Sequence, residues 1–383
     1  MSLDATPPLL SVVAPLDEHR GVAIAAISSW LAQDSASLAR CELIVVADGS
    51  EPELEQEISS MLRQQDRLLR SESGNLFSSY NAAAEAARAP ALLFTESHVV
   101  AEEDCLSAVL REIETSDPPT AVLASGGLYA GRFPETIDRL FDDELPRRLA
   151  QGWDTMVVRG TLVKRCLWKS LGGFQDQYGH YASLLFGAAM SQAGVPSRMI
   201  EEARVLHGNE GSFAELRAPL LEFGRMEVRF RAENPHSPLL DRLPACRNWE
   251  QRAKYGRRGA AVAIGSGFAA SVKALSRGRL AEAFRQAGRT LAATPNWLFG
   301  PDWAVAKARI HYRWALVRLR LFARSPTLYC KAFRDAWGGL IRCGRLVEVA
   351  DQLRRAATPR TSSPEAESLD ATAKAAEPTR SAA

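Results

Sequence analysis

Two short segments of the chain end in side chains that could contact a nucleotide or a metal ion. Residues 45–50 read VVADGS and residues 93–98 read LFTESH, so each apolar run leads into a carboxylate, followed in the second by a histidine. Ligands of open α/β sheets bind just beyond the carboxyl ends of the strands. The two segments therefore indicate an enzyme or a nucleotide-binding protein built on an α/β sheet.

The elements around these segments alternate as such a sheet requires. Apolar, β-branched runs predict strands at residues 9–14, 42–47, 67–70 and 91–95, and intervening runs predict helices at 22–31, 53–65, 75–87 and 102–114. Continuous apolar strands separated by helices are typical of a parallel sheet covered on both faces. Further along, the alternation loosens, with strands expected at 121–125, 156–164 and 205–208 and helices at 181–193 and 213–233.

Charge divides the chain into an acidic body and a basic C-terminal part. The 383 residues carry a formal net charge of +2, but residues 243–359 contain 22 Lys or Arg against 6 Asp or Glu. This imbalance favours an anionic partner for the C-terminal part. Its best-defined helix is expected at 303–324, where six Lys and Arg residues flank one apolar stripe made of Trp303, Ile310, Trp314, Val317 and Leu321.

Cysteine usage and hydropathy exclude several classes of protein. The six cysteines form no C-x-x-C pair, which argues against a zinc cluster or a redox motif and favours reduced thiols. No signal peptide is visible, and the longest nearly apolar run, at residues 259–272, is shorter than the roughly 20 residues that span a bilayer. We therefore expect a cytoplasmic protein.

Five short motifs, taken in order, resemble those of family-2 glycosyltransferases, and the chain looks like a divergent member with the GT-A nucleotide-sugar fold. They are SVVAPLD at residues 11–17, VADGS at 46–50, GNLFSSYNA at 74–82, VRG through LGGF at 158–174, and VLH at 205–207. The resemblance implies a Rossmann-like, mostly parallel α/β sheet covered by helices, with a helical C-terminal extension. It also implies inverting transfer of a sugar from a nucleoside-diphosphate donor to an acceptor hydroxyl.

The resemblance assigns nucleotide binding to the first two motifs and the helix after them. Asp48 looks like the carboxylate that accepts hydrogen bonds from the base, which would discriminate among bases. The alternative for Asp48 is a simple Asp-Gly turn. The other implied nucleotide-binding residues are Pro15, Leu16, Asp17 and Asn81.

A divalent metal ion, Mn²⁺ or Mg²⁺, is implied at a second set of residues. Glu96 and His98 stand where the family has its D-x-D motif, and His207 stands where a histidine often completes that site. The ion would act as a Lewis acid that neutralises the departing nucleoside diphosphate. An imidazole ligand shifts the preference from Mg²⁺ toward Mn²⁺ or a later metal. The alternative is that His98 caps a strand end or only touches substrate.

The catalytic base is the weakest match to the family pattern. The expected acidic pair falls on Ala182 and Ser183, neither of which can remove a proton. The nearby titratable groups are Asp176 and His180, and the unperturbed pKa of a histidine suits a base near neutrality. The alternative for His180 is a hydrogen-bonded role beneath the helix that follows.

The basic C-terminal helices have two interpretations. They pack on the sheet domain with their arginines solvated, or they lie on an anionic membrane leaflet, with Trp and Phe in the interface and Lys and Arg at lipid phosphates. Nucleic-acid binding is not expected, because the basic residues lie on apolar-striped helices without a recognisable nucleic-acid module.

The sequence thus predicts three parts: a GT-A domain at residues 1–235, a basic helical appendage at 236–355 and a disordered tail at 356–383. The expected enzyme serves a sugar or lipid-linked acceptor in cell-surface polysaccharide or glycolipid synthesis, in the cytoplasm or peripherally on the inner face of the cell membrane. One alternative is a non-catalytic nucleotide-sugar-binding partner subunit, which Ala182 and Ser183 favour. Another is a different α/β nucleotide enzyme, such as a methyltransferase, which the lack of a G-x-G-x-x-G loop after the first strand disfavours.

Overall fold

The chain divides into two compact units, of which the larger contains the sheet. Our computed structural model describes residues 7–17, 19–141, 149, 158–243, 268–274, 276–277, 279–280, 282 and 301–357. The first unit comprises Met1–Gln251 with Trp303–Leu346, and the second comprises Arg252–Asp302 with Val347–Ala383. Most of the expected tail, residues 358–383, lies outside the described residues, as do residues 259–267 of the longest apolar run. The three-part division drawn from the sequence stays a prediction.

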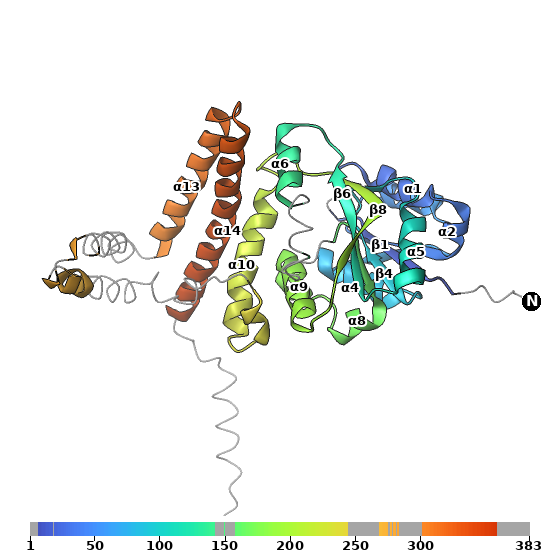
Figure 1. Cartoon of the computed structure of the whole chain (residues 1–383), viewed down its shortest axis with the longest axis horizontal. Coiled ribbons are helices and arrows are strands. Elements are labelled where there is room, and N and C mark those ends of the chain that lie inside the picture. Colours follow the sequence, from blue (N-terminus) through green and yellow to red (C-terminus); the bar gives the residue numbers. More distant parts are fainter. Residues whose placement is uncertain are drawn as a thin grey trace, which may run out of the picture. The chain divides into compact units, whose positions relative to one another are not determined.

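Eight strands form one mixed sheet in the order β3-β2-β1-β4-β7-β6-β8-β5. In Figure 1 the labelled strands of this sheet lie between α5 Cys105–Ser116 on one side and α9 Ala182–Gln192 on the other. The first four in this order pair in parallel, β6 and β8 are also parallel, and β7 and β5 pair with their neighbours in the antiparallel sense. The bounds are β1 Leu10–Pro15, β2 Cys41–Asp48, β3 Arg67–Ser71, β4 Ala91–Phe94, β5 Val99–Ala101, β6 Thr120–Gly127, β7 Thr161–Lys164 and β8 Arg198–His207.

Helices cover both faces of the sheet, and each face has its own apolar core. Successive residues of a strand point to opposite faces, so Val12 lies in one core and Val13 in the other. The first core contains side chains of α1 Ala23–Leu31, α3 Pro52–Met61 and α5 Cys105–Ser116, with α2 Ser35–Ala39 at its margin. The second contains side chains of α4 Leu76–Ala86, α8 Arg165–Ser170 and α9 Ala182–Gln192. The α/β fold expected from the alternating pattern is confirmed.

A further layer of helices packs beside the sheet within the larger unit. It includes α6 Arg132–Phe141, α10 Arg217–Glu233, the short 3-10 helices η1 Asp176–Tyr181 and η2 Pro238–Asp241, and those parts of α13 Pro301–Leu321 and α14 Pro326–Ala357 that belong to this unit. Phe213, Leu319 and Phe333 belong to its shared apolar cluster. The helices α10 and α14 touch through glycines, since a Cβ on Gly224 or Gly344 would collide with a backbone carbonyl of the other helix.

Several elements differ from the sequence-based expectation. The strand expected at 205–208 begins at Arg198, because its first residues pair with β6 across a register shift. The strand expected at 156–164 begins only at Thr161, after a turn at 158–160, and residues 156–157 lie outside the described residues. The short elements α2, β5 and α8 carry too little periodicity to be predicted. Among the described residues, each helix is too short or too polar to cross a bilayer.

Candidate active site

The carboxyl ends of β1, β2 and β4 meet at one edge of the sheet, where the loops that follow them are tied together. The N–H of Thr95, the first residue after β4, donates to the carbonyl of Val13 in β1 at 2.9 Å. The Ser97 hydroxyl donates to the Asp17 carbonyl at 3.3 Å. The loop after β1 therefore lies beside the loop after β4, and Asp48 ends β2 on the other side of β1.

Asp48 is anchored to the turn between β3 and α4. Its Oδ2 accepts hydrogen bonds from the Ser73 hydroxyl at 2.6 Å, the Asn75 N–H at 3.2 Å and the Ser79 hydroxyl at 3.2 Å. Its Oδ1 accepts from the Gly74 N–H at 3.1 Å. Burial opposes the charge, but these donors outweigh burial and lower the pKa of Asp48. The carboxylate is therefore ionised near neutrality, and Oδ1 has a second lone pair that can accept a hydrogen bond.

The loop expected to hold the base and ribose is mostly buried. Pro15 ends β1, Leu16 is 1% exposed, and Asp17 is half-buried. The Asp-Gly turn that was the alternative for Asp48 is present as well, since Gly49 has a φ of +68°. The turn and the anchored carboxylate coexist, so contact of these residues with a nucleotide stays a prediction.

Asn81 connects α4 to the Gly-Gly-Phe turn. Its Nδ2 donates to the Phe174 carbonyl at 2.8 Å, and its Oδ1 accepts from the Phe174 N–H at 2.9 Å. The amide thus holds the turn at residues 172–174 against the helix. Its expected contact with the nucleotide stays a prediction, and its observed partners are backbone groups.

Glu96, His98 and His207 converge at the same edge. β5 pairs with β8 so that Val99 lies opposite His207, which brings His98 beside it. The two Nε2 atoms lie 3.1 Å apart. Glu96 Oε2 lies 3.2 Å from Nε2 of His207 and 3.5 Å from Nε2 of His98. The three metal-ligand candidates of the sequence are therefore adjacent in space, and their donor atoms all lie within 4.8 Å of one another.

A chain of two hydrogen bonds, from His207 through Asn209 to Asp138, determines which ring nitrogen of His207 faces Glu96 and His98. We call this chain the Asn209–Asp138 relay. Asn209 Nδ2 donates to the carboxylate of Asp138, so Asn209 Oδ1 points the other way, 2.8 Å from Nδ1 of His207. Nδ1 must then carry the hydrogen, because an amide oxygen only accepts. The lone pair of His207 consequently resides on Nε2 and points at Glu96 and His98.

The electrostatics of the cluster favour an ionised carboxylate beside two neutral imidazoles. Burial would raise the pKa of Glu96, but the neighbouring imidazoles of His98 and His207 and the guanidinium of Arg159 lower it strongly. Burial lowers the pKa of His98 and of His207, which also lie in the field of Arg20. Neutral imidazole and ionised carboxylate are the forms that bind metals.

This arrangement fits a divalent cation. The lone pair on His207 Nε2 faces a carboxylate oxygen and a second imidazole nitrogen at close range, which is repulsive unless a hydrogen or a cation lies between them. His98 Nδ1 is buried and has no protein hydrogen-bond partner. Two imidazole nitrogens and one carboxylate oxygen form a mixed donor set that suits Mn²⁺ and later metals better than Mg²⁺.

The two candidate bases lie in the segment before α9. Asp176 is bound to the N-terminal turn of α4, where its carboxylate accepts from the Ser78 hydroxyl at 2.7 Å and its carbonyl accepts from Asn75 Nδ2 at 2.7 Å. It thereby shares Asn75 with Asp48. His180 Nε2 lies 3.6 Å from the carboxylate of Glu222 on α10. Neither residue is placed beside a reacting atom by these contacts, so both catalytic roles stay predictions.

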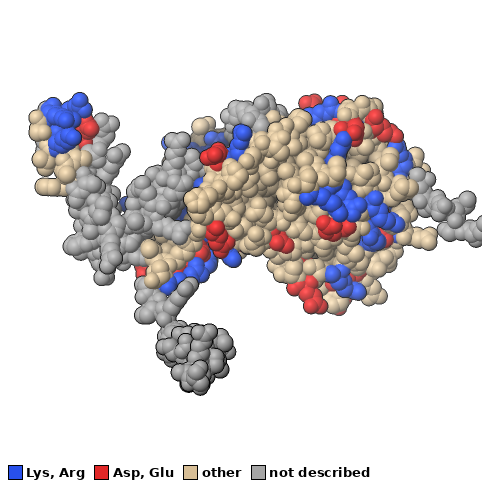
Figure 2. All heavy atoms as spheres, turned by 90° about the horizontal axis from the view of Figure 1, so that it is seen from below, with Lys and Arg blue, Asp and Glu red and all other residues tan. Residues whose placement is uncertain are grey.

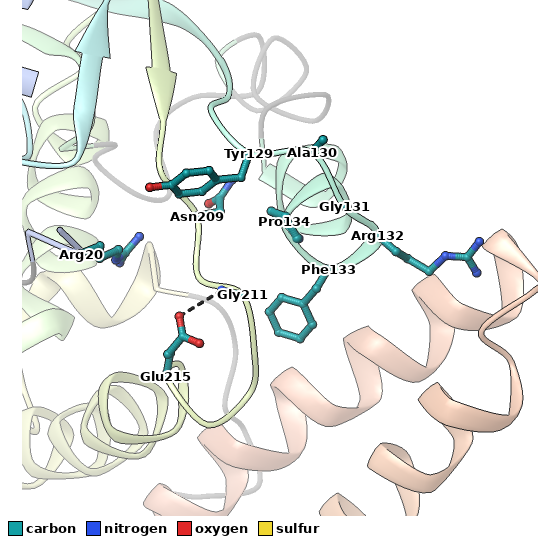
Figure 3. A pocket seen from close by; sticks show the side chains of 10 residues that line it. All are labelled: Arg20, Tyr129, Ala130, Gly131, Arg132, Phe133, Pro134, Asn209, Gly211 and Glu215. Atoms are coloured by element: carbon teal, nitrogen blue, oxygen red, sulfur yellow. Dashed lines mark hydrogen bonds between the residues drawn. The ribbon is translucent and has the colours of Figure 1, made fainter. Parts of the chain in front are cut away.

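A pocket of about 470 Å³ adjoins the metal-ligand candidates through Asn209. In Figure 3, Arg20 and Glu215 lie across the hollow from Phe133, and Tyr129 projects over it from above. The Glu215 carboxylate accepts from the Gly211 N–H at 3.0 Å. The lining combines aromatic rings with charged groups, which suits a ligand that has both apolar faces and hydroxyls.

Sequence reasoning missed four residues that shape this site. Arg159 had a signal, since it lies in the VRG motif, and Asn209 follows His207 by two positions. Asp138 and Arg20 had none, because they reach the site from distant parts of the chain. Arg20, for example, donates to the Gly208 carbonyl at 2.6 Å across 188 residues.

Residues 16–157 match the model of the family described as "Glycosyl transferase family 2". This segment of the chain belongs to that family. The matched segment of this glycosyltransferase includes Asp48, Glu96 and His98, whereas His207 lies beyond it. The mixed sheet with helices on both faces is its GT-A fold, and glycosyl transfer from a nucleotide sugar is its class of reaction.

Two solved structures illustrate what the glycosyltransferase is similar to. One is a mannosyltransferase, PcManGT from Pyrobaculum calidifontis, with 13% identity over 92% of this chain and 91% of that one, at a TM-score of 0.49. The other is S. aureus TarS 1-349, with 15% identity over 92% and 93% of the two chains, at a TM-score of 0.47. No curated protein sequence matches the chain.

Proposed function

We propose that this glycosyltransferase moves a sugar from a nucleoside-diphosphate donor to an acceptor hydroxyl with inversion, by direct displacement. Asp48 and the Pro15–Asp17 loop would hold the nucleotide, with Asn81 positioning the turn beside them. The observation that carries the proposal is the convergence of Glu96, His98 and His207 on the sheet edge next to that loop. Anionic diphosphate and donor sugar would lie between the two groups of residues.

Glu96, His98 and His207 would hold a divalent metal, with Mn²⁺ preferred over Mg²⁺. When bound, such an ion acts as a Lewis acid on the departing diphosphate. The side chains of the protein orient the site: the Asn209–Asp138 relay fixes the ring of His207, and Arg159 and Arg20 add positive charge near the phosphates. Such outer contacts orient metal ligands and maintain their protonation state.

His180 or Asp176 would accept the proton of the attacking hydroxyl. The carboxylate of Glu222, 3.6 Å from Nε2 of His180, supports His180 because it can orient the imidazole ring. The pocket between Arg20, Phe133 and Glu215 would take the sugar of the acceptor, which has apolar ring faces and hydroxyls. A cell-surface polysaccharide or glycolipid pathway is the proposed setting, with a sugar or lipid-linked acceptor.

The test is a series of thermal unfolding measurements with UDP-, GDP- and dTDP-sugars, with and without Mn²⁺. The choice includes GDP-Man, which is bound with Mn²⁺ in the mannosyltransferase structure, and UDP-GlcNAc, which is bound in the TarS structure. We expect one donor class with Mn²⁺ to raise the midpoint clearly, since a ligand at about 100 times its Kd stabilises by roughly 2.7 kcal/mol. Asp48→Ala should abolish the shift, and the exposed Glu103→Gln should retain it. Absence of a donor effect in all conditions would contradict the proposal.

The second candidate function, a non-catalytic nucleotide-sugar-binding subunit, is favoured by the start of α9. Ala182 is fully buried there and Ser183 donates to the His180 carbonyl, so neither offers a base. Donor hydrolysis and transfer to simple sugars separate the two functions. His180→Gln should lower turnover by roughly 10²–10⁴-fold with donor binding unchanged if this residue is the base. Donor binding without any turnover in the native protein would favour the silent subunit.

A further inference from the structure

α13 is apolar on two opposite faces. Its inner face packs against α14 and the 213–220 segment, and Ala315 and Leu319 are buried there in one cluster with Phe333. The stripe expected from the sequence lies on the other side: Ile310 and Trp314 are each 57% exposed, Val317 43% and Leu321 67%. Small residues such as Ala304, Ala308 and Ala315 form the packing face of the helix instead, and the large side chains of the stripe are left outside it.

The four exposed residues form a continuous band. They are spaced at i, i+4, i+7 and i+11, which puts them on one side of a helix over three turns. Large apolar side chains normally leave the surface when a partner is available, and a band of this size marks an interaction surface. We call this band the α13 stripe.

Basic residues border the α13 stripe along both edges. At 100° per residue, Arg313 and Arg320 lie on one edge, and Lys307 and Arg318 lie on the other. No Asp or Glu occurs between Trp303 and Arg324. Of these cations, Arg318 is paired, with Asp335 of α14 at 2.7 Å. The surface is therefore an apolar centre between two positive margins.

A groove of about 450 Å³ continues this surface between α13 and α14. Trp314 lies at its margin, and His311, Arg334 and Arg342 line it. Gly338 and Gly339 keep its floor free of side chains. With three arginines against a single aspartate, the groove suits a phosphate group.

We propose that the outward face of α13 docks on the surface of an anionic bilayer, with the α13 stripe in the interface and the flanking arginines at lipid phosphates. A helix with an apolar band, Trp at its centre and Lys or Arg on both margins lies in the plane of the membrane rather than across it. The groove beside Trp314 receives the phosphate of one lipid headgroup. This inference rests on the lipid-linked acceptor of the proposed function, and it identifies the residues that would bring the enzyme to such an acceptor.

A second copy of the chain is a poorer occupant for this face. A twofold contact places the same patch on both subunits, so Arg313 and Arg320 of one copy would face the basic margins of the other. Like charges at an interface cost free energy, and the single acid of α13, Asp302 in its first turn, is already paired with Arg354. Lipid phosphates supply the missing negative charge, so the charge pattern favours the bilayer.

Docking would also bring the acceptor pocket toward the lipid. Phe133, which lines that pocket, contacts Phe333 of α14 with ring centroids 5.0 Å apart. Arg132 lies over the ring of Tyr329 at 5.4 Å, and Figure 3 shows its side chain directed away from the pocket toward these helices. If the proposed acceptor is lipid-linked, the same helices that bind the bilayer thus position its binding pocket.

The test is flotation of the full chain with vesicles, without donor or metal. One set contains phosphatidylcholine alone, and the other contains phosphatidylcholine with phosphatidylglycerol. We expect binding to the anionic vesicles, weakened by salt. The stripe variant Trp314→Gln/Leu321→Gln should reduce binding at least tenfold, and the charge variant Arg313→Gln/Arg320→Gln should reduce it by about 30-fold.

The matched control is Arg70→Gln/Arg111→Gln, which removes two exposed charges from the sheet unit and should bind like the native chain. All variants should unfold at the native midpoint, because the changed side chains are exposed. Binding that is equal on neutral vesicles, or unaffected by both α13 variants, would overturn the proposal. So would a native dimer that the stripe variant dissociates while no vesicle binds.

Failure of vesicle binding leaves the donor-binding experiment untouched, and failure of donor binding leaves the vesicle experiment untouched. Asp48→Ala should still float with anionic vesicles, since the residue lies at the sheet edge and not on α13. The two proposals can therefore fail separately.

Discussion

Two carboxylates of the sheet, Glu42 and Glu96, differ in what surrounds them. Glu42 is fully buried on β2 and accepts hydrogen bonds from the Ser11 hydroxyl at 2.6 Å, the Arg88 N–H at 2.7 Å and Arg67 at 3.2 Å. Glu96 is also largely buried, but its close neighbours are the imidazoles of His98 and His207. Glu42 is satisfied by the protein itself, whereas the lone pairs around Glu96 converge on one point. Burial of a carboxylate alone does not indicate a site; the character of its neighbours does.

The largest expected effect comes from Glu96→Gln. We expect it to reduce glycosyl transfer by roughly a thousandfold, because it removes one ligand and the negative charge of the site. The Mn²⁺ affinity, measured by calorimetry, should fall at least as strongly as in the Asn209→Ala variant described below. The free energy of unfolding of the metal-free protein should fall less than after the corresponding change at Glu42, because the close neighbours of Glu96 are imidazoles and not the arginine and backbone donors that Glu42 satisfies. If Glu96→Gln strongly lowers the free energy of unfolding of the metal-free protein, Glu96 has a structural role like that of Glu42.

Glu42→Gln should show the opposite pattern. We expect the free energy of unfolding to fall by about 3 kcal/mol, because buried donors lose an ionised acceptor. Urea denaturation measures this change. Mn²⁺ and donor binding should stay native in the folded variant, because Glu42 lies near the start of β2, at the opposite end of the strand from Asp48. If Glu42→Gln loses Mn²⁺ binding and keeps the native free energy of unfolding, the distinction between Glu42 and Glu96 is wrong.

Asn209→Ala sharpens the comparison at the relay. It frees Nδ1 of His207, so both ring tautomers become accessible, and we expect Mn²⁺ affinity to fall by roughly 10–100-fold. The control is Glu202→Gln, because Glu202 is exposed and lies on β8, the strand that ends at His207. This variant should bind Mn²⁺ with the native affinity. If Asn209→Ala binds Mn²⁺ like the native chain, the relay does not position the imidazole.

The smallest effect is the pH dependence of the Glu42 contribution. Burial raises the pKa of Glu42, but the hydrogen bonds of Ser11 and Arg88 and the charge of Arg67 outweigh it, so the pKa lies below its usual 4.5. The stabilisation is therefore fully present above pH 4.5 and is lost as the pH falls through the lowered value. Denaturation of the native chain and of Glu42→Gln between pH 7 and pH 4 should show a constant difference that shrinks only at the acid end. A difference that grows on acidification would contradict this assignment.

Charge on the surface follows a similar distinction. On the face shown in Figure 2, basic and acidic side chains lie next to one another over the sheet unit, as expected for solvated pairs. α13 has basic margins without acids of its own beyond Asp302. Paired surface charges contribute little to stability or recognition, whereas a margin of one sign selects a partner of the other.

Local pattern was sufficient for much of the fold and for part of the site. The apolar run of β2 and its end at Asp48 are set by side chains that are neighbours in the sequence. The same holds for the N-terminus of α4, where Asn75 caps the helix by accepting from the Phe77 N–H. Such features depend on contacts within a few residues, so spacing and residue type predict them.

The identity of the candidate metal ligands was readable from the sequence, but their meeting was not. His98 and His207 are 109 residues apart and become adjacent only because the three residues of β5 pair in register with the end of β8. That register depends on the summed packing of the whole sheet, as does the reach of Asn209 to Asp138. Likewise, the periodicity of α13 gave its stripe, but the neighbours on its other side decided that the stripe faces outward. Short-range order is encoded by adjacent residues, whereas which faces and which distant side chains meet is decided by the free energy of the assembled fold.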